Sequence, residues 1–209
     1  MIKNSKINKF NNYKNNSKEF FDKMAHKKHG DSFRHYENVL KYLNDIRFEK
    51  LLDLGTGTGS LLEKLEHRIE NKGTKFYGID ISSKMIEVAR GKKLNAEFLN
   101  GDSENLPYEN EMFDIITCIN SFHHYPNPQL VAKEIARVLK LNGKLILGEI
   151  WLPPFFKSIV NKLLPYGKSG DFKIYSNSEI EDIFMKENII LEEKKYVCFT
   201  NYTYLFKKI

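Results

Sequence analysis

From residue 50 onward, short apolar runs alternate with segments in which apolar residues recur every three or four positions. The runs predict buried strands and the periodic segments predict amphipathic helices. The predicted strands cover residues 51–54, 75–80, 96–100, 113–119 and 144–150. The last helix before the fifth strand, at 129–139, is expected to end at Asn142-Gly143. Strands that alternate with crossover helices predict an α/β fold with a doubly wound, parallel sheet.

The alternation stops after residue 150. Residues 151–176 contain three prolines and six aromatic residues. A helix is predicted at 178–187, and two further strands are predicted at 189–196 and 199–206. Only Val197 and Cys198 separate these two strands, so the last strand must run antiparallel to its neighbour.

The segment before the first strand has a different pattern. Residues 1–16 are rich in Asn and Lys and poor in apolar residues, a composition that predicts poor order. Ser17 is a candidate cap for a helix that carries Phe21 and Met24 on one face. Residues 30–32 are expected to interrupt the helical conformation and to cap a second helix.

The length of 209 residues fits one domain better than two. We predict a basic arm at 1–16 and a single domain at 17–209, with N-terminal helices at 17–46 and an insertion at 151–176. No apolar run approaches the ~20 residues of a membrane span, and no apolar segment typical of a secretory signal is present. Cys118 and Cys198 lie in apolar runs and indicate buried free thiols in the cytoplasm, with a disulfide as the alternative.

The net charge of +6 is concentrated near the N-terminus. Residues 1–34 carry nine Lys and Arg against three acidic residues, and the rest of the chain carries 24 of each kind. The globular part is therefore neutral overall, and the basic arm is typical of a solvated tail. An RNA-binding arm stays open as the alternative, although we expect no nucleic-acid partner.

Glycines follow the first predicted strand in the spacing G-x-G-x-G. At Gly55, Gly57 and Gly59 the absence of a Cβ lets a ligand approach the backbone, and the next helix offers unpaired N–H groups at its start. Such a turn indicates a nucleotide site. Ser60 stands where the dinucleotide fingerprint G-x-G-x-x-G has its last glycine, so the spacing disfavours a dinucleotide.

Acidic residues follow the second and third predicted strands. Asp80 ends the second strand, where a carboxylate can accept hydrogen bonds from a ribose diol or can merely cap the following helix. Gly101 and Asp102 follow the third strand. Because the carboxyl ends of parallel strands meet at one edge of a sheet, we expect these residues to converge on one crevice.

Five stretches of this chain carry a resemblance to a known family. They are LLDLGTGTG, FYGIDISSKMIEVAR, NGDSENLPYENEMFDIITC, SFHHYPNP and ARVLKLNGKLIL. In this order and near this spacing they resemble the core of class I S-adenosylmethionine-dependent methyltransferases, in particular the small-molecule group of ubiquinone and menaquinone biosynthesis. The resemblance implies a Rossmann-like seven-stranded sheet of order 3-2-1-4-5-7-6 with strand 7 antiparallel, and S-adenosyl-L-methionine as cofactor.

The resemblance also implies roles for the glycine-rich loop and for the first acidic residue. The loop would follow the methionine and ribose portions of the cofactor, with a supporting acid two residues before the first glycine. These positions are Asp53, Gly55, Thr56, Gly57 and Gly59. Asp80 would bind the ribose hydroxyls.

Five further positions are implied to contact the cofactor. Ile81 and Met85 would flank the adenine ring, and Asp102 would accept a hydrogen bond from its amino group. Ser103 would contact the adenine edge, and the backbone of Asn120 would lie near the methionine end. We expect no metal ion.

The methyl acceptor is less well defined by the sequence. In-line transfer requires mainly alignment, and a base only where the acceptor is a hydroxyl or phenol. His123 and His124 follow the fourth strand and are the candidate catalytic residues. The alternative is that both orient their loop through backbone hydrogen bonds.

The family places its variable acceptor-binding elements before the first strand and after the fifth. This predicts an acceptor pocket in which residues 151–176 act as a lid. Its expected wall consists of Phe21, Met24, Trp151, Phe155 and Phe156. Such a wall suits a small aromatic or lipophilic acceptor, unless the aromatic side chains simply complete the core.

Three other functions share part of this pattern. A nicotinamide-dependent oxidoreductase would share the glycines and Asp80, but not the spacing or Asp102. An RNA methyltransferase is supported by the basic arm, although Asn120-Ser-Phe-His stands where enzymes that methylate exocyclic amines carry Asn-Pro-Pro-Tyr. A non-catalytic cofactor-binding module would retain the same site. The oligomeric state does not follow from the sequence.

Overall fold

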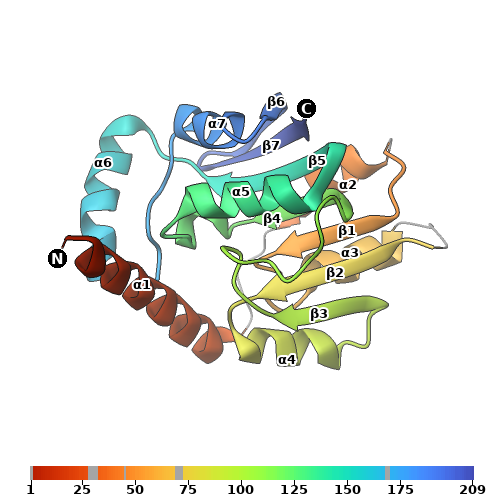
Figure 1. Cartoon of the computed structure of the whole chain (residues 1–209), viewed down its shortest axis with the longest axis horizontal. Helices are drawn as coiled ribbons and strands as arrows, with labels where there is room; N and C mark the ends of the chain where they lie inside the picture. The colour runs from red at the N-terminus through yellow and green to blue at the C-terminus, as the bar shows by residue number, and fades with distance from the viewer. Residues whose placement is uncertain (1, 28–32, 45, 69–72, 168–169) are drawn as a thin grey trace.

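The computed structural model describes residues 2–27, 33–44, 46–68, 73–167 and 170–209. A single seven-stranded sheet of order β3-β2-β1-β4-β5-β7-β6 forms its centre (Figure 1). Strands β1 to β5 run parallel. Strand β7 runs antiparallel to β6, as the short connection predicted, and to β5, as the resemblance implied. The strands are β1 (Lys50–Leu54), β2 (Lys75–Asp80), β3 (Ala96–Asn100), β4 (Phe113–Ile119), β5 (Leu139–Ile150), β6 (Ile189–Cys198) and β7 (Asn201–Lys208).

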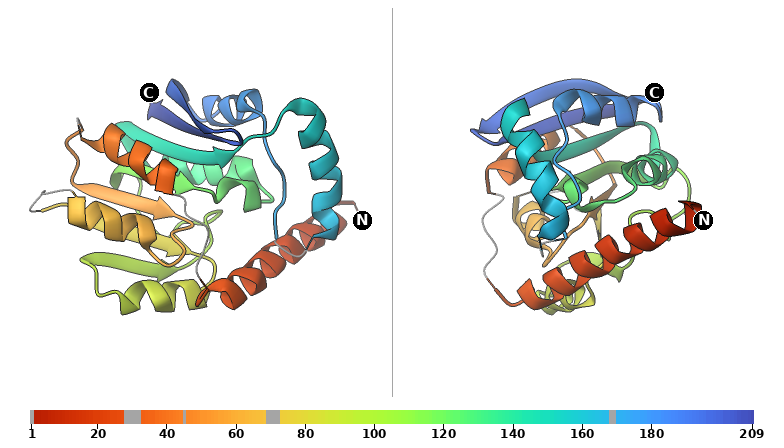
Figure 2. Two further views of the ribbon diagram at one scale, coloured as in Figure 1. Left: turned by 180° about the vertical axis from the view of Figure 1, so that it is seen from behind. Right: turned by 90° about the vertical axis from the view of Figure 1, so that its left-hand side faces the viewer.

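Helices cover both faces of the sheet, which makes the fold doubly wound. Helices α5 (Pro128–Val138) and α7 (Asn177–Met185) pack on one face. Helices α2 (Phe33–Leu43), α3 (Ser60–Arg68) and α4 (Ser83–Gly91) pack on the other (Figure 2). Because successive strand residues point to opposite faces, Leu51 belongs to the second core cluster and Leu52 to the first.

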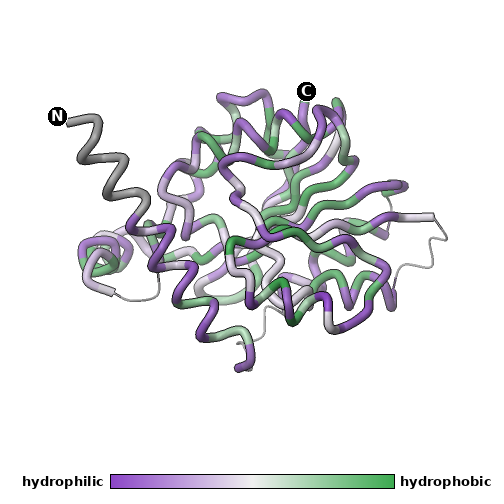
Figure 3. Tube along the Cα trace, turned by 60° about the horizontal axis from the view of Figure 1, so that its bottom comes forward, coloured by the Kyte–Doolittle hydropathy of each residue, from purple (hydrophilic) through white to green (hydrophobic). Residues whose placement is uncertain are grey.

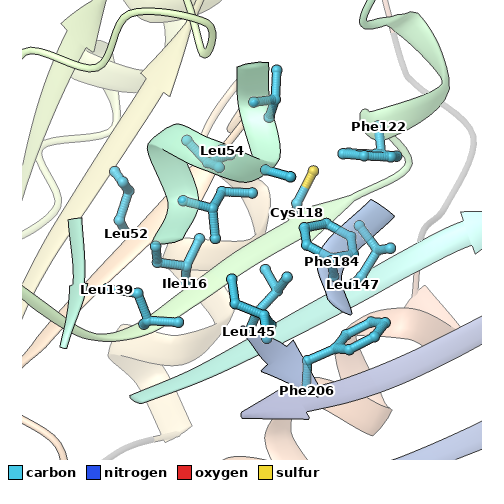
Figure 4. Packing of buried hydrophobic residues seen from close by; sticks show 14 of the residues in the cluster. Leu52, Leu54, Ile116, Cys118, Phe122, Leu139, Leu145, Leu147, Phe184 and Phe206 are labelled. Atoms are coloured by element: carbon cyan, nitrogen blue, oxygen red, sulfur yellow. The ribbon is translucent and has the colours of Figure 1, made fainter. Parts of the chain in front are cut away.

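Apolar side chains fill both layers of the core. Figure 3 shows hydrophobic residues along the central strands, whereas the described part of α1 is largely hydrophilic. Figure 4 shows the cluster under α5 and α7, where Ile116 and Cys118 of β4 pack with Leu145 and Leu147 of β5. All four side chains are fully buried. Burial of this kind contributes about 25 cal/mol per Å² of apolar surface and holds the strand ends in fixed positions.

The parallel register aligns the carboxyl ends of four strands. Leu54 of β1 pairs with Ile79 of β2 and Cys118 of β4, and Asp80 of β2 pairs with Asn100 of β3. The turns that follow these strands therefore lie side by side at one edge of the sheet, where ligands of open α/β sheets bind.

The N-terminal segment differs from the prediction. Residues 2–16, for which composition predicted poor order, belong to a single helix α1 (Ile2–Met24), and Ser17 is a buried residue inside it rather than a cap. The physical reason is contact with distant segments. The Lys14 ammonium pairs with acidic side chains after β3, and the Tyr13 ring meets Phe172 edge-on at 5.1 Å. The predicted break at 30–32 lies outside the described residues.

Three element boundaries also differ. Helix α5 ends at Val138 and β5 begins directly at Leu139, so Asn142, with its φ of 63°, lies within the strand and does not end the helix. The β6–β7 connection is Phe199-Thr200, two positions later than predicted. Both cysteines are free; Cys118 is buried as expected, whereas Cys198 is partly exposed.

The structure contains elements that the sequence did not predict. Helix α6 (Pro154–Leu163) follows β5 and continues into a short 3-10 turn, η2 (Leu164–Tyr166). Another 3-10 turn, η1 (Phe122–His124), follows β4. Within the described residues, no helix combines the length and apolar character needed to cross a membrane.

Candidate functional site

The loop after β1 depends on glycine at three positions. Gly55, Gly57 and Gly59 adopt φ values of 67°, 54° and 72°. Residues other than glycine rarely adopt such positive φ values. A Cβ on Gly55 would lie 2.0 Å from Ser121 Oγ, and one on Gly59 would lie 3.0 Å from the Phe98 ring. A Cβ on Gly57 would meet no atom within 4 Å, so at this residue the open backbone faces free space.

Asp80 joins this loop to the start of α4. Its Oδ2 accepts a hydrogen bond from the Gly57 N–H at 2.9 Å, and its Oδ1 accepts one from the Ser82 N–H at 2.8 Å. Ser82 also caps α4 through its side chain, which accepts from the Met85 N–H. Burial raises the pKa of Asp80 above its ordinary value, although the two backbone hydrogen bonds oppose this shift.

Asp53 lies behind the loop and is buried. Its Oδ1 accepts a hydrogen bond from the Thr117 hydroxyl of β4 at 2.7 Å. Burial raises the pKa of this carboxyl to about 7. Asp53 therefore links β1 to β4 beneath the loop, and it is not one of the residues that line the cavity described next.

A cavity of about 760 Å³ opens at this edge of the sheet, within the range typical of small-molecule sites. Eleven residues predicted for the site line it: Phe21, Gly55, Thr56, Gly57, Asp80, Ile81, Met85, Asp102, Ser103, Asn120 and His124. Gly59 and Asp53 support the loop from outside the cavity. His123, Met24, Trp151, Phe155 and Phe156 are not among the lining residues.

Helix α1 contributes cavity residues that sequence reasoning missed. The Lys14 ammonium lies 2.7 Å from the Asp102 carboxylate and 2.6 Å from that of Glu104. Burial lowers the pKa of Lys14, but its hydrogen bonds to the two carboxylates outweigh this and raise it. Ser17 of α1 also lines the cavity, as does Lys27, which follows the end of α1. Partners 88 residues apart leave no local signal in the sequence, so these residues could not be found from pattern alone.

Tyr125 is a further lining residue without a sequence prediction. Its hydroxyl lies 3.1 Å from Ser103 Oγ and 2.8 Å from Ser121 Oγ. It therefore connects the turn after β3 to the turn after β4. Its position just after the paired histidines was the signal that could have identified it.

The two adjacent histidines have different environments. The His123 ring is buried, with Nδ1 2.8 Å from Glu149 Oε2 and Nε2 3.5 Å from Asp171 Oδ1. Its backbone carbonyl accepts hydrogen bonds from the Phe172 and Lys173 N–H groups. Burial lowers the pKa of His123, but the charge of Glu149 outweighs this and raises it. His123 thus holds the segment around Asp171 against η1.

His124 faces the cavity. Its Nδ1 lies 3.2 Å from Asp171 Oδ1, and its ring meets Phe21 edge-on at a centroid distance of 4.9 Å. Burial and the neighbouring His123 charge lower the pKa of His124 to about 4. The side chain is therefore a neutral imidazole at neutral pH.

His123, His124 and Asp171 each offer one ligand atom, and these atoms lie within 4.8 Å of one another. This donor set could hold a transition metal, although the sequence led us to expect none. Methyl transfer from an activated sulfonium donor requires no metal.

The predicted aromatic wall is wrong for residues of the insertion. Phe155 and Phe156 are 71% and 57% exposed, so they neither line the cavity nor complete the core. The cause is the orientation of α6, whose Asn161 side chain bonds both the N–H and the carbonyl of Ile174 and fixes the opposite face outward. Trp151 instead packs edge-on against Tyr202 of β7.

The site fits an adenosine-bearing ligand with a polar tail. The open space at Gly57 allows a ligand to lie against the loop backbone. The carboxylate of Asp80 at the end of β2 suits ribose hydroxyls, and the apolar Ile81 and Met85 suit a flat base. Asp102, by contrast, is already paired with Lys14, so its predicted bond to an amino group would share the carboxylate with that lysine.

Comparisons with known proteins identify the family of the chain. A family model described as a methyltransferase domain matches residues 52–147. A demethylmenaquinone methyltransferase from Thermotoga maritima is 32% identical over 181 residues, which cover 78% of each chain. A demethylmenaquinone methyltransferase from Lactococcus lactis is 35% identical over 126 residues, and the match covers 57% of this chain and 50% of that protein.

Solved structures share the fold. The YcgJ protein from Bacillus subtilis superposes with a TM-score of 0.72 at 21% identity, over 83% of this chain and 97% of that one. A putative methyltransferase in complex with the Trm112 activator of Haloferax volcanii gives 0.76 at 21% identity, over 91% of this chain and 96% of that one. Together with the sequence relatives and the cavity at the strand ends, these likenesses show that the chain belongs to the class I S-adenosylmethionine-dependent methyltransferases, with S-adenosyl-L-methionine as cofactor.

Proposed function

We propose that this methyltransferase acts on a small, flat, aromatic or lipophilic acceptor of the quinone type. The observation that carries the proposal is the composition of the cavity. Phe21, Tyr36 and Ile119 line the same cavity as Asp80 and the glycine-rich loop. Aromatic and apolar walls favour a flat, weakly polar acceptor over a sugar or a nucleic-acid backbone. Relatives named demethylmenaquinone methyltransferase support the same acceptor class.

The residues of the chain act mainly by binding and alignment. S-adenosylmethionine, when bound, supplies a methyl group already activated on a sulfonium. The loop backbone at Gly57 and the Asp80 carboxylate would hold the cofactor at the sheet edge, and Phe21 and Tyr36 would hold the acceptor beside it in the same cavity. Alignment of two reactants in this way can lower the barrier by about 7–11 kcal/mol.

Helix α1 serves as the cover of the cavity, in the place where we expected the 151–176 insertion. Lys14, Ser17 and Phe21, spaced three and four residues apart, all line the cavity from one helix face. Lys14 fastens this face to Asp102 and Glu104. A closed cover excludes water, which strengthens the electrostatic interactions inside the site.

His124 is the group that we propose to face the acceptor. As a neutral imidazole it can accept a proton from an acceptor hydroxyl or an acidic carbon, and the Asp171 carboxylate beside it stabilises the charge that forms. His123 is a positioning residue, because its contacts with Glu149 and with the backbone at 172–173 hold Asp171 near His124.

A methyl-transfer assay with labelled S-adenosylmethionine tests the proposal. The acceptors to compare are a soluble demethylated naphthoquinone kept in its reduced hydroquinone form by a chemical reductant, a hydrophilic amine and bulk RNA. We expect turnover with the naphthoquinone and none with RNA. Phe21→Ala should lower kcat/KM for the naphthoquinone without changing cofactor affinity, whereas Met185→Ala, at an exposed position of α7, should change neither. Methylation of RNA in preference to the naphthoquinone would overturn the proposal.

A further inference from the structure

Helix α6 presents a continuous apolar face to solvent. Phe155, Phe156, Ile159 and Leu163 are 71%, 57%, 45% and 61% exposed, and their spacing puts them on one side of the helix. Tyr166, in the turn η2 that continues α6, is 86% exposed. No residue of α6 is buried.

The orientation of this face is fixed by the opposite side of the helix. Asn161 forms two hydrogen bonds with the Ile174 backbone, and Val160 and Leu164 beside it are only partly exposed. Lys157 on the same side pairs with Glu179 of α7 at 2.9 Å. The apolar face therefore points outward because the polar side is attached to the domain. A contiguous exposed apolar patch on a folded chain typically marks an interaction site.

The charged residues of α6 and η2 are basic. Residues 154–167 contain Lys157 and Lys162 and no Asp or Glu, and Lys157 is paired with Glu179. The end of this segment adjoins α1 (Figure 2). A small cavity lined by Asn12 and Tyr13 of α1 and by Leu164 and Pro165 of η2 lies between them. Lys162 of α6 is exposed beside the apolar face.

We propose that α6 is a docking helix for the surface of an anionic lipid bilayer. Aromatic and aliphatic side chains on one face of a helix whose own charged residues are all lysines are features of helices that lie in the plane of the membrane interface. The charge complements anionic headgroups, each basic residue near the surface adding to the attraction. A second copy of the chain would bring the same lysines into mutual repulsion.

The position of α6 links the docking surface to the cofactor cavity. Helix α1, which adjoins η2, also lines the cofactor cavity through Lys14, Ser17 and Phe21. A lipid-soluble acceptor could thus pass between the bilayer and the cavity along α1. This consequence rests on the proposed function, whereas the docking itself does not.

Flotation of the full chain with lipid vesicles, without cofactor or acceptor, tests the docking. One set contains phosphatidylcholine alone and the other contains 30% phosphatidylglycerol. We expect binding to the anionic vesicles that weakens as salt rises. The double variant Phe155→Ser, Phe156→Ser should bind at least about tenfold more weakly, since it removes two inserted aromatic side chains.

Leu141→Ser provides the matched control. Leu141 is 59% exposed but lies near the start of β5, at the strand end opposite the one that leads to α6. Its variant should bind vesicles like the parent, and all three proteins should show the same melting temperature. Equal vesicle binding by the parent and the double variant would overturn the proposal. The proposal would also be overturned if the parent sediments as a dimer and the double variant sediments as a monomer, since α6 would then be an interface between copies. Because no turnover is measured, failure of the acceptor proposal leaves this result intact.

Discussion

The Lys14 ammonium group of α1 lies 2.7 Å from the Asp102 carboxylate that follows β3. The two residues are 88 positions apart, and the same ammonium also pairs with Glu104. The pair attaches the N-terminal helix to the cofactor edge of the sheet. The single positive charge of Lys14 also offsets part of the negative charge of the two acidic side chains, which line or adjoin the cavity. The first prediction follows from this attachment.

Lys14→Met should reduce the free energy of unfolding by about 1–3 kcal/mol, because it leaves the buried Glu104 carboxylate without its cation while keeping the aliphatic stem. Urea denaturation measures the change. Lys18→Met, one turn later at an exposed position, should change the stability by less than about 0.5 kcal/mol. Equal effects of the two variants would mean that the Lys14 pairs contribute nothing beyond an ordinary surface contact.

Gly57→Ala should weaken cofactor binding more than it disturbs the fold. Its positive φ costs a side-chain residue about 1–2 kcal/mol. The new Cβ meets no protein atom within 4 Å and instead occupies the space for the ligand. Calorimetric titration with S-adenosylmethionine should show at least a tenfold loss of affinity.

Gly91→Ala is the matched control for that variant. Gly91 is the last residue of α4, and a Cβ there also meets no atom within 4 Å. Because its φ is not positive, alanine should raise the stability by up to about 1 kcal/mol and leave the affinity unchanged. If both variants bind the cofactor like the parent, the loop backbone does not contact the ligand.

The buried carboxyl of Asp53 should make the free energy of unfolding depend on pH. Burial raises the folded-state pKa of this carboxyl to about 7 from 3.8, so between these pH values the folded state binds one proton more than the unfolded state. Stability contributed by this group is therefore greatest below pH 3.8 and decreases as pH rises toward 7, by at most about 1.4 kcal/mol per pH unit. Asp53→Asn removes this dependence and can still accept the Thr117 hydroxyl.

The test is the stability difference between Asp53→Asn and the parent, measured by urea denaturation at pH 5, 6 and 7. The variant should gain relative stability as pH rises. Since the histidines titrate in both proteins, their contributions cancel in the difference. A difference independent of pH would show that Asp53 is ionised throughout this range.

His124→Phe should lower kcat for a hydroxyl or acidic-carbon acceptor by about 10²-fold, because it removes the proposed proton acceptor while keeping an aromatic ring against Phe21. Cofactor affinity from calorimetry should stay within twofold. His67→Phe, at an exposed position of α3, should leave kcat unchanged.

Treatment of the parent with EDTA should also leave kcat unchanged. Loss of activity on chelation would instead assign the His123, His124 and Asp171 cluster to a metal.

Local patterns were sufficient for the central architecture and for the part of the site formed by strand ends. Residues 51–54 and 113–119 could be assigned as buried strands because a continuous apolar run has few other ways to be buried. Gly55, Gly57 and Asp80 could be assigned to one crevice because parallel strands with right-handed crossovers bring their carboxyl ends to one edge. The antiparallel last strand followed from a connection of two residues.

Contacts between distant segments were beyond the reach of those patterns. Composition predicted an arm of poor order at 1–16, but residues 2–16 belong to a helix that the ion pairs of Lys14 and the packing of Tyr13 on Phe172 attach to the domain. Likewise, six aromatic residues in 151–176 suggested a pocket wall. The hydrogen bonds between Asn161 and Ile174 turn Phe155 and Phe156 away from the cavity instead.

The sequence by itself thus determined the five parallel strands with their crossover helices, the antiparallel last strand and the cofactor loop, because these depend on hydrophobic period, chain connectivity and the conformational freedom of glycine. The full strand order was implied by the family resemblance. Only the tertiary structure decided which polar groups meet: Lys14 with Asp102, His123 with Glu149, and His124 with Asp171. Each of these pairs joins residues on different elements. Their distances are set by how whole elements pack, and no local period along the chain encodes that packing.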